Sequence, residues 1–126
     1  MRKIKFDTTD PKLGLTKSVG FIWSDEKGVY LEYQVSDTII ELYKSKIKDV
    51  FIPYSQIADI LYKKLWFKRG QLVIKLSSLK GLGKIPLLES TDICVAIKKN
   101  QKENCLDFVS NTKLDLSTAI LDAVGD

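Results

Sequence analysis

The sequence predicts a mainly β domain: an antiparallel sandwich or partly open barrel of about seven strands, capped by a helix near the C-terminus. Between residues 19 and 97, short runs of β-branched and aromatic residues are separated by turn-forming residues. From residue 100 onward, apolar residues recur at helical spacing instead. The length of 126 residues corresponds to a single domain.

The first clear strands form a hairpin. Residues 19–24 are rich in aromatic and β-branched side chains, and residues 29–35 alternate between apolar and polar ones, which indicates a half-buried strand. Residues 25–28 supply a polar turn that ends in glycine. The preceding residues 1–17 have no clean period and contain Asp10-Pro11 and Gly14, so they are predicted to form an irregular N-terminal arm.

Further strands are predicted along the middle of the chain. They cover residues 38–44, 57–67, 70–76 and 93–97, and a turn at residues 68–70 joins two of them. Pro53 cannot donate a ladder hydrogen bond and therefore marks a strand end or an edge.

The pattern becomes helical at Asn100. Asn100 and Glu103 have the spacing of a capping box, which predicts a helix over about 101–111. A short helical tail is expected in 113–126, so the main domain should span 18–112. The positions predicted to be buried are Leu31, Tyr33, Ile52, Ile57, Leu72, Ile74, Val95, Ile97 and Leu106.

The composition argues against an enzyme. The chain has no histidine, which removes the commonest general base and metal ligand. No motif for catalysis, a metal or a cofactor is found, so none of these is expected. Cys94 and Cys105 are predicted to be buried free thiols, with a disulfide as the alternative. No signal peptide or transmembrane stretch is recognised, so a reducing, cytoplasmic location is expected.

Charge is unevenly distributed along the chain. Residues 18–41 carry a net charge of −4 and residues 42–69 a net charge of +5. Such asymmetry indicates either a surface for an anionic partner or a solvated sheet face. The basic part includes an aromatic turn that is a candidate partner surface, formed by Lys63, Lys64, Trp66, Phe67, Lys68 and Arg69. Alternatively, its lysines only protect an exposed strand edge.

A second candidate surface lies in the predicted hairpin. Successive side chains of a strand face opposite ways, so its aromatic residues cannot all enter the core. Some of them should lie outside, where aromatic rings commonly anchor protein interfaces. The candidates are Phe21, Trp23, Tyr30 and Tyr33. The acidic surface beside them suits the basic 42–102 region of another copy, which would give a heterologous contact.

Residues 52–60, IPYSQIADI, resemble the "IP-x-x-x-I-x-x-I" segment of bacterial pleckstrin-homology-like (PH-like, GRAM-type) domains. The aromatic pair Trp66-Phe67, the strand from Gly70 to Leu76 and the turn leading to Pro86 follow in the same order, and the resemblance covers about 19–112. It implies two packed antiparallel sheets with one end plugged by the helix. It implies little about function, because this scaffold binds lipids, peptides and its own copies, but the PH domains that bind phosphoinositides usually carry a cluster of Lys and Arg around the first hairpin. Residues 24–28, taken as that hairpin, hold two acids and one lysine, so phosphoinositide binding there is not expected.

These observations predict a non-enzymatic binding or scaffolding domain of a bacterial cytoplasm, with an unidentified protein or its own copies as partner. Weak peripheral binding to an anionic membrane through residues 62–69 is the first alternative. Single-stranded nucleic-acid binding is the second, although the aromatic residues do not visibly alternate on one open strand face.

Overall fold

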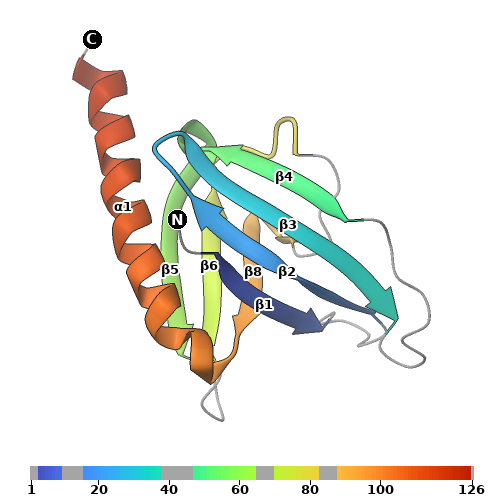
Figure 1. Ribbon diagram of the computed structural model, residues 1–126. Coiled ribbons are helices and arrows are strands. Elements are labelled where there is room, and N and C mark those ends of the chain that lie inside the picture. The colour runs from blue at the N-terminus through green and yellow to red at the C-terminus, as the bar shows by residue number, and fades with distance from the viewer. Residues whose placement is uncertain (1–2, 10–15, 38–46, 65–69, 83–87, 126) are drawn as a thin grey trace.

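The computed structural model describes residues 3–9, 16–37, 47–64, 70–82 and 88–125. In these ranges two antiparallel sheets face one another, and one long helix runs along their side and extends past them (Figure 1). The sheets do not close into a continuous barrel. The predicted mainly β fold, a partly open sandwich capped by a C-terminal helix, is therefore confirmed.

The first sheet contains four strands in the spatial order β1 (Ile4–Thr9), β2 (Thr16–Ser24), β3 (Gly28–Asp37) and β4 (Lys48–Pro53). All neighbours are antiparallel, and the β2–β3 turn occupies the predicted position. The turn is held by the Asp25 carboxylate, which accepts hydrogen bonds from the amides of Lys27 at 2.8 Å and Gly28 at 3.3 Å. An aspartate that bonds the backbone two residues later is a common turn former.

The second sheet has the spatial order β5 (Ile57–Lys64), β6 (Gly70–Leu76), β8 (Asp92–Ile97) and β7 (Leu88–Glu89). A 3₁₀ turn, η1 (Tyr54–Gln56), carries the chain from β4 into β5. The sheets approach each other where β1 lies beside β8, because the Ala96 amide donates a hydrogen bond to the Thr8 hydroxyl at 2.7 Å.

The core lies between the sheets and is completed by one stripe of the helix α1 (Lys102–Gly125). The stripe follows helical spacing through Cys105, Phe108, Val109, Thr112 and Leu116, all of them buried. The largest fully buried core side chains include Ile4, Phe6, Ile22, Leu31, Ile52, Ile60, Leu72, Ile74, Ile93 and Ile97.

Residues 4–9 form a strand and residues 16 and 17 begin the next one, so the prediction of an irregular arm over 1–17 is wrong for these described residues. Ile4 and Phe6 of β1 point into the core, and their exposed fractions are 0% and 1%. The alternation covers only one short strand and is followed at once by Asp10-Pro11, so the pattern was too brief to recognise. The domain therefore begins well before residue 18.

The helix also differs from prediction. It is continuous to Gly125, not a helix over about 101–111 followed by a separate tail in 113–126. No glycine or proline interrupts it, and Thr112 is buried where a break was expected. Asn100 lies inside a preceding 3₁₀ turn, η3 (Lys99–Gln101), so the helix begins after it and Asn100 is not its N-cap.

The core predictions fail only at Leu106, which is 38% exposed. It follows the buried Cys105 directly and is rotated by about 100° around the helix axis, onto the flank of the stripe. The other eight predicted core residues are buried. The strand predicted at 38–44 and the end of the one predicted at 57–67 lie outside the described residues.

Candidate functional site

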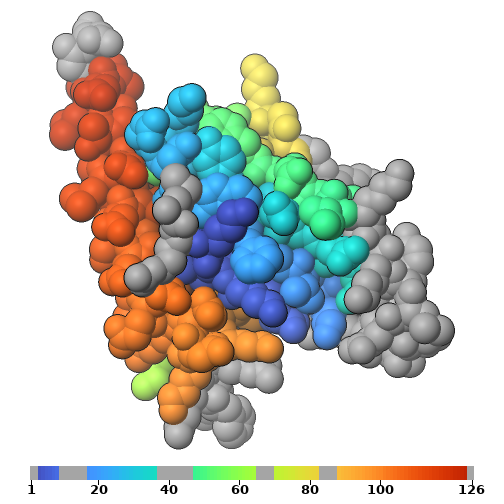
Figure 2. Space-filling model, in the orientation of Figure 1, coloured from blue at the N-terminus to red at the C-terminus, as the bar shows by residue number. Residues whose placement is uncertain are grey.

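The outward side of the first sheet carries the side chains that do not enter the core. Four of these are aromatic, and we call them the aromatic face: Phe21 and Trp23 of β2, Tyr30 of β3 and Phe51 of β4. Phe21 is 37% and Phe51 43% exposed. No other described strand or helix crosses this side of the sheet, which faces the reader in Figures 1 and 2.

Three of the rings form a row across three strands. Trp23 and Tyr30 are cross-strand partners whose rings stack, with centroids 5.6 Å apart and planes 8° apart. Tyr30 and Phe51 are partners on the next pair of strands, with centroids 4.9 Å apart and planes tilted by 42°. Lys3 ends the row, since its Nζ lies 4.2 Å from the centroid of the Trp23 ring. Each contact falls in the range of favourable aromatic or cation–π geometry.

The middle ring of this row is held by the neighbouring turn. The Tyr30 hydroxyl donates a hydrogen bond to Asp25 Oδ2 at 2.9 Å. Partial desolvation opposes ionisation of Asp25, but the amide bonds from Lys27 and Gly28 and the bond from Tyr30 prevail and lower its pKa. The same hydrogen bond raises the pKa of Tyr30. The carboxylate thus orders both the turn and the ring, which keeps the row in place without a ligand.

The sequence-based candidates are divided by the fold. Phe21, Trp23 and Tyr30 come together on the outward side, which confirms that some of the hairpin aromatics lie outside the core. Tyr33 does not join them, because it is 2% exposed and packs in the core. Phe51 was missed, although the strong apolar position Ile52 beside it implies an outward neighbour.

The outward side of the second sheet offers no comparable surface among the described residues. Val73 and Cys94 are cross-strand partners there and are only 1% and 9% exposed. The predicted basic turn follows β5, where Lys63 and Lys64 are exposed. Its other members, Trp66, Phe67, Lys68 and Arg69, lie outside the described residues, so this surface stays a prediction.

The acidic turn that was taken as the first hairpin is a later one, so its charges do not bear on phosphoinositide binding. With β1 in the sheet, the turn at residues 24–28 belongs to the second hairpin of the fold, not the first. The first hairpin joins β1 to β2 through residues 10–15, which contain Lys12 and lie outside the described part of the chain. The expectation about this lipid therefore stays untested.

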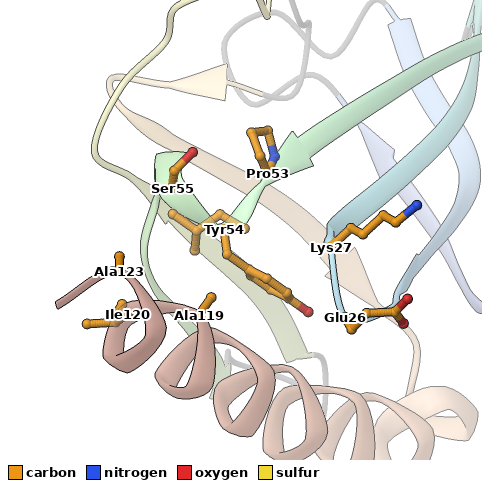
Figure 3. A pocket seen from close by; sticks show the side chains of 9 residues that line it. Glu26, Lys27, Pro53, Tyr54, Ser55, Ala119, Ile120 and Ala123 are labelled. Carbon is orange, nitrogen blue, oxygen red and sulfur yellow. The ribbon is translucent and has the colours of Figure 1, made fainter. Parts of the chain in front are cut away.

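A cleft of about 390 Å³ lies between the later turns of α1 and the β2–β3 turn. Tyr54 lies between the helix residues Ala119, Ile120 and Ala123 and the turn, while the charged ends of Glu26 and Lys27 point away from it (Figure 3). The Tyr54 hydroxyl donates to the Asp25 carbonyl oxygen at 2.6 Å. Burial, aided by the charge of Asp115, raises the pKa of Tyr54 to about 12, so the phenol stays neutral. The cleft thus presents mainly carbon and a hydroxyl that is already bonded.

Reactive groups are scarce in the described ranges. Cys94 and Cys105 are free thiols, as predicted, and burial raises the pKa of each to about 12, which suppresses the nucleophilic thiolate. No three His, Cys, Asp or Glu side chains of the described residues converge as metal ligands. Among those residues, no helix is long and apolar enough to cross a bilayer.

Comparisons with protein-family models, with curated proteins and with solved structures gave no match to this chain.

Proposed function

We propose that this chain is a non-enzymatic binding domain that recognises a protein through the aromatic face, in a cytoplasmic setting. The observation that supports this most is the ordered row of Trp23, Tyr30 and Phe51 on a solvent-facing sheet. Aromatic residues are enriched at the centres of protein interfaces, where truncating one often costs 2 kcal/mol or more. The resemblance to PH-like domains agrees with this role, because that scaffold binds peptides, lipids and its own copies.

The state of the rings favours a binding role over a purely structural one. The rings contact each other on the surface, while the core between the sheets is filled by other residues. Immobilising a flexible side chain on binding costs about 0.5–1.5 kcal/mol, and rings that are already stacked avoid part of that cost. An exposed sheet face with ordered rings suits another protein surface better than a small molecule, which prefers a concave pocket.

Photo-crosslinking tests this proposal. The photoreactive phenylalanine analogue p-benzoylphenylalanine replaces Phe21 or Phe51 in cells that natively express the chain, and Lys75 is the matched control. Lys75 is exposed on β6 of the second sheet. We expect protein adducts from positions 21 and 51 and none from position 75. Absence of adducts from both aromatic positions, or equal adducts from all three, refutes the proposal.

A further inference from the structure

The charged residues around the aromatic face are arranged in a fixed order across the sheet. In one row, Lys5 of β1, Phe21 of β2, Glu32 of β3 and Asp49 of β4 are successive cross-strand partners. Lys3 ends the neighbouring row, beside Trp23. Across these two rows the face is therefore basic on β1, aromatic in the middle and acidic on β3 and β4, and Asp7 follows on β1 in the next row.

The acidic side contains an unfavourable pair. Glu32 and Asp49 lie directly opposite each other on adjacent strands, and like charges in that position destabilise a sheet. Neither carboxylate forms an ion pair with a described lysine or arginine, and Lys5 has no described carboxylate partner either. A cation brought from outside to this position would relieve the repulsion.

We propose that the occupant of the aromatic face is a second copy of this chain, in a two-fold symmetric dimer. The inference rests on the proposed function, because it uses the same face. A two-fold axis parallel to the strands, between β2 and β3, places β1 of each copy over β4 of the other. Lys5 then meets Asp49 of the second copy, Trp23 meets its Tyr30, and Lys3 meets its Phe51. Two Lys5–Asp49 contacts form, and each brings a cation beside the Glu32–Asp49 pair, while Glu32 itself faces Phe21 of the second copy.

Charge selects this arrangement over its alternatives. A two-fold axis perpendicular to the strands would lay β1 on β1, so that Lys5 meets lysine and the carboxylates meet carboxylates. The heterologous contact expected from the sequence needs a separate basic surface. Here both signs occur on one face, so the contact is isologous and closes at two copies.

The dimer should be weak. Four strands about 4.8 Å apart and about 20 Å long give a footprint of roughly 400 Å² on each copy. Stable interfaces bury about 800 Å² on each partner, so we expect a dissociation constant in the micromolar range or above. We also expect it to rise with salt, because the paired charges lie at an exposed face.

Charge exchange tests the proposal with purified full-length chain. Lys5→Glu makes both sides of the face acidic, and Glu32→Lys/Asp49→Lys makes both sides basic. Each variant alone should dimerise at least 10-fold more weakly than the native chain in sedimentation velocity. An equimolar mixture should recover native-like affinity as a heterodimer, since positions 5 and 49, which face each other, then carry opposite charges at both contacts. Lys75→Glu, which changes the net charge by the same amount as Lys5→Glu, should dimerise like the native chain.

Several outcomes would overturn the inference. These are a native chain that stays monomeric up to about 1 mM, a dimer that neither exchange weakens, and a mixture that does not recover. Asp49→Lys alone replaces the double variant if circular dichroism shows that the latter is unfolded. A monomeric chain whose position 21 still crosslinks a different protein in cells overturns the dimer but leaves the proposed function standing.

Discussion

The contact between α1 and β2 provides a direct test of how the helix is attached. The Ser24 and Thr112 hydroxyls are 2.9 Å apart and hydrogen-bonded. They differ in exposure, because Thr112 is 0% exposed whereas Ser24 is half-buried. Ser24→Ala and Thr112→Val each delete one partner with little change in shape, and the double variant deletes both.

The difference in burial sets the expected magnitudes. Ser24→Ala leaves the Thr112 hydroxyl buried and unpaired, so the free energy of unfolding should fall by about 1–3 kcal/mol. Thr112→Val leaves a Ser24 hydroxyl that water can reach, and it should cost only about 0.5–1.5 kcal/mol. The double variant should lie close to the native chain, since removing both partners of a buried pair is nearly neutral. At an unfolding entropy of about 2.1 cal/mol/K per residue, each kcal/mol lowers Tm by roughly 4 °C.

Urea unfolding of all four proteins, followed by circular dichroism, measures the double-mutant cycle. The coupling energy should be about 1 kcal/mol or more, and Ser24→Ala should be the less stable single variant. Additive single effects would mean that the two hydroxyls are not coupled. A Thr112→Val variant that is less stable than Ser24→Ala would contradict the burial argument.

Three further predictions follow from single sites. Asp25→Asn should lower the free energy of unfolding at pH 7, because folding lowers the pKa of Asp25. The loss of stability should persist above about pH 4 and shrink as the pH falls through the pKa of Asp25 in the folded state. A loss that does not change with pH in urea unfolding would contradict this. Gly20→Ala should cost about 2 kcal/mol or more by urea unfolding, because a Cβ there would overlap the Glu32 carbonyl oxygen across the strands; a native-like midpoint would contradict that packing. Cys94 and Cys105 should resist Ellman's reagent at pH 8 until urea unfolds the chain, and rapid labelling of the native protein would show that the thiols are accessible.

The fold could be predicted where the side-chain pattern is long enough to express a period. The alternation over β3 placed Leu31 and Tyr33 in the core, and the same logic placed Leu72 and Ile74 of β6 there. The same reasoning failed for β1, because its short alternation is followed by a proline. Whether this segment forms a strand depends on its tertiary partners. Ile4 and Phe6 are buried only because β2 and β8 lie beside them.

The length of α1 could not be predicted from its apolar residues. A break was expected after residue 111 because the apolar residues before and after it were read as two separate helices, yet nothing in the backbone chemistry enforces one. In the structure one continuous stripe is buried from Cys105 to Leu116, and Ile120 and Leu121 beyond it are 51% and 69% exposed. The helix therefore continues past the sheets, where its later apolar residues are not needed by the core (Figure 1).

The aromatic face was only partly predictable, for a similar reason. Alternation shows that some hairpin aromatics must point outward, and over β3 it places Tyr33 with Leu31 in the core and Tyr30 on the other side. Phe51 joins the row only because β4 pairs with β3 in the register that places it opposite Tyr30. Such cross-strand neighbours depend on how the strands pair in the fold, and they cannot be read from the sequence of either strand alone.

Because the aromatic face is separate from the core, variants of that face can test binding without disturbing the fold. The cluster that fills the space between the sheets excludes all four aromatic residues of the face. Trp23, Tyr30 and Phe51 contact one another in a row, and Phe51 is 43% exposed, so truncating it removes an exposed ring without opening a cavity in the core. Surface substitutions away from core features usually change stability by no more than about 0.5 kcal/mol. A loss of association in such a variant, at unchanged stability, therefore reports on binding by the face itself.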